Sequence, residues 1–111
     1  MWYVDKEREY LSALVYDFLK TLRERKVTER KKQEFFNFID NLNQGTEIQK
    51  RRFKMFFNLK ENEKLESYSS IGRKENCSCN AIRNSVIRIR GILVNLKDNE
   101  REQLVNILNK H

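Results

Sequence analysis

Apolar residues recur along this chain three and four positions apart, a spacing that gathers them on one face of an α-helix. In residues 3–25 they predict one buried stripe, made of Leu11, Leu14, Val15, Phe18 and Leu22. A second helix is predicted from Thr28, whose hydroxyl can cap it, with Glu29 in its first turn. Its expected buried positions, with Phe38 on their flank, are Phe35, Phe36, Ile39 and Leu42. We expect Asn43, Gln44 and Gly45 to end this helix, because Gly accepts a left-handed conformation.

The same periodicity continues after Gly45. Thr46 is expected to cap a third helix that runs to about Asn58. Its apolar positions are Ile48, Phe53, Phe56 and Phe57, and its basic positions are Lys50, Arg51, Arg52 and Lys54. Residues 60–66 are polar and predict a loop, which a short helix over 68–75 and a longer one over 79–96 follow. Asp98 is expected to cap a last helix whose apolar residues are Leu104, Val105, Ile107 and Leu108.

The composition favours helices throughout. The 111 residues include three Gly and no Pro, which is less turn punctuation than a β-rich domain needs. We therefore predict an all-α fold, a helical bundle. Gly45 is the best candidate boundary between an N-terminal helical hairpin, residues 1–45, and a second unit, residues 46–111. The hairpin would serve core packing, dimerisation or contact with a partner.

Positive charge is concentrated in the second unit. The chain carries a formal net charge of +7, of which residues 1–45 contribute +1 and residues 46–111 contribute +6. A basic half beside a nearly neutral half indicates that the C-terminal half binds a polyanion. A solvated basic surface that maintains solubility would give the same charge count, so this alternative stays open.

Residues 67–93 carry the pattern of a helix-turn-helix, in which two helices cross at close range. Ile71 supplies an apolar anchor, and Gly72 supplies the small residue that such a crossing needs. Asn76 can adopt the left-handed conformation of the turn, and Cys77 would fill the turn as a small apolar plug. Ser78 can then cap a second helix. The buried stripe of that helix is expected at Ile82, Val86, Ile89 and Leu93.

The opposite face of this second helix carries the candidate DNA contacts. Asn can pair with an adenine edge and Arg with a guanine edge, each through two hydrogen bonds, while an apolar side chain can touch a thymine methyl. The expected base contacts are Asn80, Arg83, Asn84 and Ile87. The expected phosphate contacts are Arg73, Lys74, Ser78, Arg88 and Arg90. Gly91 lies on the same side, where it would let a phosphate or another helix come close.

Residues 46–96 resemble region four of the primary-type sigma factors of bacterial RNA polymerase. The resemblance rests on TEIQKRRFKMFFNL at 46–59 and SYSSIGRKENCSCNAIRNSVIRIRGIL at 67–93. The spacing from Ile71 and Gly72 through Ile82 to Leu93 matches without a gap. The resemblance implies a sequence-specific transcription regulator that inserts helix 79–96 into the major groove of double-stranded DNA. RNA polymerase is the second partner that it implies.

The sequence also departs from that family. At the family's base-contacting positions, Arg83 alone keeps the family's residue type, and the family's apolar position at 85 is Ser here. Residues 1–45 do not resemble region two, which binds the polymerase and melts DNA. The chain is therefore similar to the small stand-alone regulators of phages and mobile elements in Gram-positive bacteria. Two alternative functions stay open: a sigma mimic or anti-factor that binds polymerase or another protein without contacting bases, and the region-four subunit of a split sigma factor. A homodimer through residues 1–45 stays open as well.

Other classes of function find no motif in the sequence. It has no phosphate-binding glycine loop and no nucleophile elbow, so we do not expect an enzyme. We expect no metal or cofactor, because two Cys and one His fall short of the four ligands of a zinc site. Cys77 and Cys79 are too close in sequence for a relaxed disulfide, which favours a reduced, cytoplasmic protein. The resemblance to sigma factors implies a location at the bacterial nucleoid. The apolar runs are too short to span a bilayer.

Overall fold

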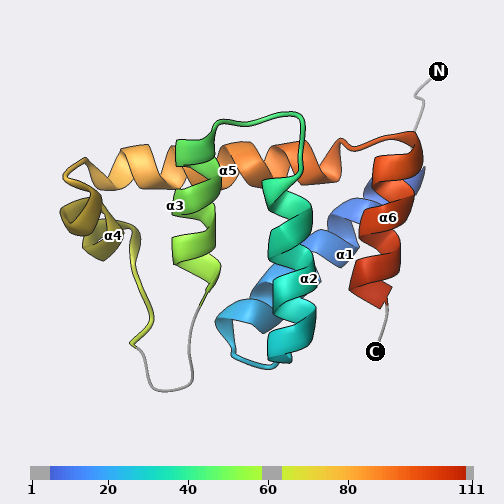
Figure 1. The fold of residues 1–111 in the computed structure, drawn as a ribbon, viewed down its shortest axis with the longest axis horizontal. Coiled ribbons are helices and arrows are strands. Elements are labelled where there is room, and N and C mark those ends of the chain that lie inside the picture. The colour runs from blue at the N-terminus through green and yellow to red at the C-terminus, as the bar shows by residue number, and fades with distance from the viewer. Residues whose placement is uncertain (1–5, 59–63, 110–111) are drawn as a thin grey trace.

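The structure, a computed structural model, describes residues 6–58 and 64–109. These residues form six α-helices and no strand, which confirms the all-α prediction. In chain order the helices are α1 (Lys6–Arg23), α2 (Glu29–Asp40), α3 (Glu47–Phe57), α4 (Tyr68–Glu75), α5 (Cys79–Val94) and α6 (Asp98–Asn109). α3, α2 and α6 stand side by side across the long helix α5, α1 passes behind α2, and α4 packs at the N-terminal end of α5 (Figure 1).

One main cluster of buried apolar side chains joins α1, α2, α3, α5 and α6. Its fully buried members include Leu11, Phe35, Phe53, Ile89 and Leu104. The predicted stripes are confirmed at most positions, and Phe38 is half-buried on the flank where it was expected. Ile48 is exposed, and the other exceptions lie half-buried at the edge of the cluster: Leu14, Phe56, Val105 and Ile107. Burial of this apolar surface supplies the main favourable term in folding.

Aromatic rings run through this core from α1 to α4. The ring centroids of Phe18 and Phe35 are 4.8 Å apart, and Phe35 lies 6.3 Å from Phe53 on α3. Phe53 and Phe56 both contact Phe57, at 4.7 Å and 5.0 Å. Phe56 then stacks on Tyr68 of α4 at 4.6 Å. Such pairs stabilise beyond the area that they bury, so the chain of rings ties the N-terminal helices to α4.

The predicted N-terminal caps are confirmed at three helices. The Thr28 hydroxyl accepts a hydrogen bond from the Lys31 backbone N–H at 3.3 Å. Thr46 and Gln49 form a reciprocal capping box at the start of α3. Ser78 accepts from the Ala81 N–H at 3.1 Å at the start of α5. Each cap satisfies N–H groups that a helix end leaves unpaired.

Four predicted helix ends were wrong. α5 ends at Val94 rather than at residue 96. α1 ends at Arg23, with Arg25 at φ +60°, rather than at residue 25, and residues 3–5 lie outside the described part. α2 ends at Asp40, so Asn43, Gln44 and Gly45 form the connection to α3. Gly45 does have a positive φ, +85°, but in that connection. Asp98 is the first residue of α6, at φ +55°, and not the residue before it. The predicted loop is non-helical at residues 64–66, and residues 60–63 lie outside the described part.

α3 also differs from its predicted pattern of apolar and basic positions. Ile48 is 49% exposed, whereas Lys50 is only 3% exposed. The Lys50 Nζ donates hydrogen bonds to the backbone carbonyls of Leu42, at 2.7 Å, and Asp40, at 3.4 Å. A cation there satisfies carbonyls at the C-terminal end of α2 and complements the helix dipole. The contact with α2 therefore places Lys50 on the buried side of α3, together with Phe53 and Phe57, while Ile48 faces outward.

α6 returns to the N-terminal helices and packs against α1 and α2. Its Arg101 forms an ion pair with Glu7 of α1 at 2.6 Å, and the Lys31 Nζ of α2 donates to the Leu108 carbonyl at 3.4 Å. The C-terminal helix thus contacts residues on the other side of Gly45. The division of the chain at residue 45 stays a prediction.

Candidate nucleic-acid interface

α4 and α5 are joined by a tight turn over residues 76–78. Asn76 has the predicted left-handed conformation, with φ 56° and ψ 47°. The backbone N–H of Cys77 donates to the Gly72 carbonyl at 2.9 Å, which closes the C-terminal end of α4. Ser78 is extended and caps α5, so the chain changes direction within three residues. The bounds of α4, the start of α5 and the turn residues agree with those predicted for a helix-turn-helix.

Gly72 lies where the backbone of the turn approaches α4 most closely. A Cβ added at Gly72 would lie 2.8 Å from the carbonyl oxygen of Cys77 and 3.4 Å from the backbone nitrogen of Cys79. Such a separation from a carbonyl oxygen is shorter than a van der Waals contact, so Gly is required here for steric reasons. Ile71 and Ile82 are fully buried outside the main cluster. We attribute the packing of α4 on α5 to these two side chains and to the missing Cβ.

The predicted base contacts lie together on the outer side of α5. Asn80, Arg83, Asn84 and Ile87 are all exposed, and we call them the outer stripe. Their spacing of three, one and three residues places them on one helix face about 10 Å long. Ile82 and Val86, on the opposite face, are buried. The major groove, about 12 Å wide, admits a helix that presents such a face.

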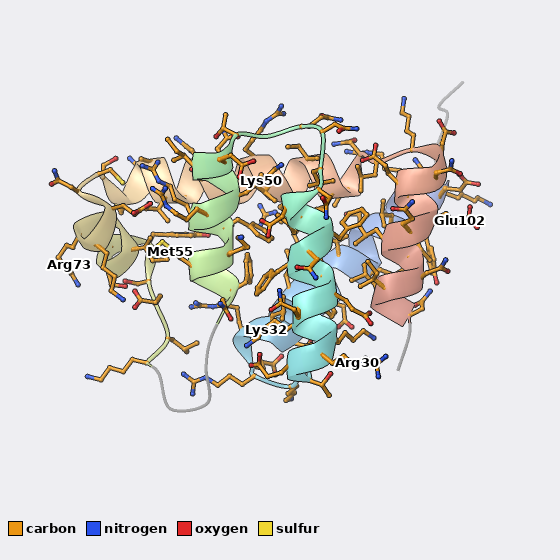
Figure 2. The ribbon with its side chains drawn as sticks, in the orientation of Figure 1. Arg30, Lys32, Lys50, Met55, Arg73 and Glu102 are labelled. Atoms are coloured by element: carbon orange, nitrogen blue, oxygen red, sulfur yellow. The ribbon has the colours of Figure 1, made fainter. Side chains whose placement is uncertain are left out.

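The predicted phosphate contacts are more dispersed. Arg73 is exposed on α4 and extends outward from the end of the molecule that α4 forms (Figure 2). Lys74 pairs with Glu66, and the Ser78 oxygen already accepts the capping hydrogen bond. Arg88 is exposed, whereas the guanidinium of Arg90 lies over the ring of Tyr16 on α1, 5.0 Å from its centroid. Arg73 and Arg88 are therefore the cations with the most direct access to a phosphate beside the outer stripe.

Carboxylates hold α4 to its neighbours. Glu75 accepts two hydrogen bonds from Arg51 of α3, at 2.7 Å and 3.1 Å, while Arg52 lies 3.5 Å from the same oxygen. The hydrogen bond from Arg51 lowers the pKa of Glu75. The hydrogen bond from Lys74 lowers the pKa of Glu66 in the same way. Lys74, which the sequence suggested as a phosphate contact, thus also orients α4.

Arg23 connects α1 to the segment that leads into α4, a role that sequence analysis missed. Its Nη1 donates to the carbonyl of Phe56 at 3.0 Å and to that of Glu66 at 2.8 Å. Its guanidinium also lies 4.0 Å from the ring centroid of Phe56. Burial lowers the pKa of this guanidinium. The partners are 33 and 43 residues away, so no local pattern could have indicated them.

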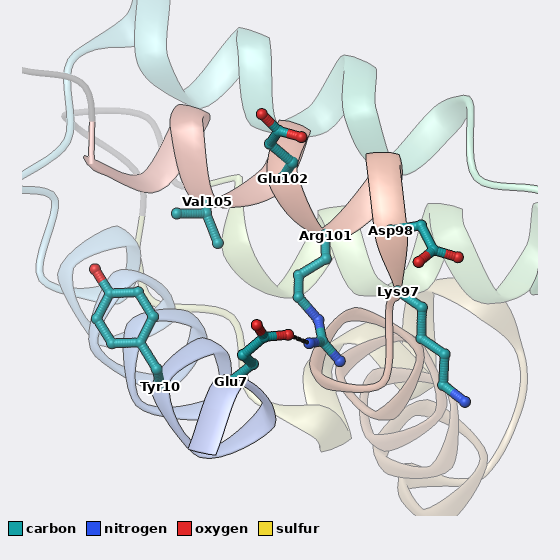
Figure 3. A pocket seen from close by; sticks show the side chains of 7 residues that line it. All are labelled: Glu7, Tyr10, Lys97, Asp98, Arg101, Glu102 and Val105. Carbon is teal, nitrogen blue, oxygen red and sulfur yellow. Dashed lines mark hydrogen bonds and ion pairs between the residues drawn. The ribbon is translucent and has the colours of Figure 1, made fainter. Parts of the chain in front are cut away.

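A pocket of about 510 Å³ lies between α1 and α6, away from the outer stripe (Figure 3). Glu7 and Arg101 pair across it, and the Arg101 Nε also donates to the Leu96 carbonyl at 2.8 Å. Its charges are mixed in sign, and the pair of Glu7 and Arg101 joins the two helices. Among residues 6–58 and 64–109, no group of His, Cys, Asp or Glu is placed to hold a metal. Cys77 is half-buried and Cys79 is exposed, both as free thiols.

No helix in the described part of the chain combines the length and the apolar character needed to cross a membrane. Comparisons with family models, curated proteins and solved structures found no match to this chain. The similarity to sigma factor region four therefore rests on the residues of 46–96 alone.

Proposed function

We propose that this protein is a sequence-specific DNA-binding regulator of transcription that inserts the outer stripe of α5 into the major groove. One observation carries the proposal: Asn80, Arg83, Asn84 and Ile87 are exposed together on a helix whose opposite face is buried. Two amides and a guanidinium on one face match the hydrogen-bonding edges of bases. The net charge of +6 over residues 46–111 supports attraction to the phosphate backbone. The resemblance to bacterial sigma factors adds a location at the bacterial nucleoid to this proposal.

The roles of the individual residues divide into two kinds. Asn80, Arg83 and Asn84 contact base edges, and Ile87 contacts a thymine methyl. Arg73 and Arg88 contact phosphates and fix the helix in the groove, which adds affinity without sequence preference. Lys74 reaches a phosphate only by leaving Glu66, and Arg90 only by leaving Tyr16. We therefore expect smaller contributions from Lys74 and Arg90.

The test begins by selecting bound duplexes from a random-sequence pool and measuring affinity for the enriched site by fluorescence anisotropy. Arg83→Ala and Asn84→Ala should each weaken binding to that site by about 1–3 kcal/mol and should barely change binding to unrelated duplexes. Arg73→Ala should weaken binding to both kinds of duplex and lower the salt slope by about one. Identical behaviour of the two classes would contradict the assigned roles. Capture of RNA polymerase by a protein that binds no duplex would favour the polymerase-binding alternative.

A further inference from the structure

A strongly basic surface lies where α1 ends and α2 begins. Residues 20–32 contain seven Lys or Arg and two Glu, a net charge of +5. The rest of residues 1–45 contains two Lys or Arg and six Asp or Glu, a net charge of −4. The nearly neutral total of residues 1–45 thus conceals a local concentration of positive charge. We call residues 20–32 the basic corner.

Part of this charge serves the fold and part lies on the surface. Lys32 is buried against Glu29, at 2.6 Å, and Arg23 is held by backbone carbonyls. Lys20 and Arg25 are exposed, and the side chains of Lys26 and Arg30 are 67% and 88% exposed. Lys26 pairs with Glu24 at 3.0 Å, and Arg30 lies 3.9 Å from Glu34. Exposed pairs of this kind are weak, so a phosphate can replace the carboxylate.

The basic corner and the outer stripe lie on different sides of the molecule. The start of α3 meets α5, because a Cβ at Gly45 would lie 2.9 Å from the Ile89 side chain. The other end of α3 meets the basic corner, through the hydrogen bond from Arg23 to the Phe56 carbonyl. An 11-residue helix such as α3 is about 16 Å long. Figure 2 likewise shows Arg30 at the end of α2 that points away from α5.

We infer that the basic corner binds a second segment of duplex DNA, so that one chain holds two segments together. This inference rests on the proposed function of α5. A duplex is stiff over about 150 base pairs, so a short duplex seated on the outer stripe cannot also bend round to the corner. The contacts are cation–phosphate contacts, which need no particular sequence. None of the exposed large hydrophobic side chains lies in residues 20–32, which fits a phosphate surface better than a membrane-inserting one.

A surface of this kind binds duplex weakly. Non-specific duplex binding has a Kd of roughly 10⁻⁴ to 10⁻⁶ M at physiological salt. The corner is therefore occupied where duplex is present above that concentration, and the assay supplies the second duplex in that range.

The test is a bridging assay with an immobilised duplex that carries the selected site and a labelled second duplex in solution. The corner variant is Lys26→Gln with Arg30→Gln. The control variant, Lys6→Gln with Lys97→Gln, removes the same charge from two exposed positions outside both surfaces. Wild type and control should retain the labelled duplex, and the corner variant should retain about tenfold less. All three should bind the immobilised duplex equally and should show the same helical circular dichroism.

Stoichiometry separates the two proposals. Sedimentation with excess short duplex should give two duplexes per wild-type chain and one per chain of the corner variant. Wild-type protein that binds one duplex and retains no second duplex would overturn this inference and leave the proposed function standing. Equal retention by the corner variant and wild type would also overturn it. Failure of wild-type protein to bind the first duplex would instead overturn the proposed function, and the inference with it.

Discussion

Replacing Gly72 with Ala is expected to destabilise the protein, although this exchange usually stabilises a helix. In a helix interior Ala is better than Gly by about 1 kcal/mol. At Gly72, however, the new Cβ would lie 2.8 Å from the Cys77 carbonyl oxygen and 3.4 Å from the backbone of Ser78 and Cys79. These are backbone atoms, so a side-chain rotation cannot remove the clash and the turn itself must move. Overpacking of this kind costs about 1–3 kcal/mol and can cost more, so a net loss of up to about 2 kcal/mol remains after the helix gain of about 1 kcal/mol.

Gly91 provides the matched control, because it also lies in a helix but a Cβ there would have no neighbour within 4 Å. Gly91→Ala should raise stability by about 0.5–1 kcal/mol. Thermal unfolding followed by circular dichroism measures both variants, since 1 kcal/mol corresponds to about 4–8 °C in Tm for a domain of this size. Tm should fall for Gly72→Ala and rise for Gly91→Ala. A rise in both would refute the close approach of α4 to the turn.

Three further perturbations test the contacts around this unit. Lys50→Met should lower the free energy of urea unfolding by about 2–3 kcal/mol, because buried carbonyls lose a charged donor. Lys54→Met, which removes a partly exposed ion pair, should lower it by no more than about 1 kcal/mol. Equal losses in the two variants would contradict the assigned role of Lys50. Glu66 and Glu75 have lowered pKa values in the folded protein, so their stabilising contribution is complete above a Glu carboxyl's ordinary pKa of about 4.3 and is lost as the pH falls through the folded-state values. Replacing both with Gln should reduce the loss of unfolding free energy as the pH falls into the acid range. An unchanged pH dependence would count against these hydrogen bonds. Arg25→Gly should raise stability by about 0.5–1 kcal/mol, because Arg25 has φ +60° at the end of α1, and a lower Tm would be the contrary result.

Local features of the fold could be predicted from the sequence. Thr28, Thr46 and Ser78 cap their helices because a hydroxyl reaches an N–H only a few residues away. The bounds of α4 and the left-handed Asn76 were predictable for the same reason, since a turn is set by its own residues. The exposure of the outer stripe followed from helical periodicity, once Ile82 and Val86 were recognised as buried.

Features that depend on distant segments could not be predicted. Lys50 is buried because the end of α2 offers it carbonyls, and the sequence near Lys50 does not reveal that neighbour. Glu75 and Arg51 are 24 residues apart, and Arg23 contacts carbonyls still further along the chain. The basic corner was visible in the sequence, but in a charge count over residues 1–45 its net charge of +5 is cancelled by the −4 of the other residues. Charge counted over short windows would have revealed it.

The central claim is that the outer stripe of α5 contacts DNA bases. The most direct measurement is a nuclear magnetic resonance titration of the protein with the selected duplex, followed at the side-chain amide signals of Asn80 and Asn84. Both signals should shift as the duplex saturates the protein, and should shift less with an unrelated duplex at equal occupancy. If both signals stay in place while the protein is fully bound, α5 does not enter the groove and the account is wrong.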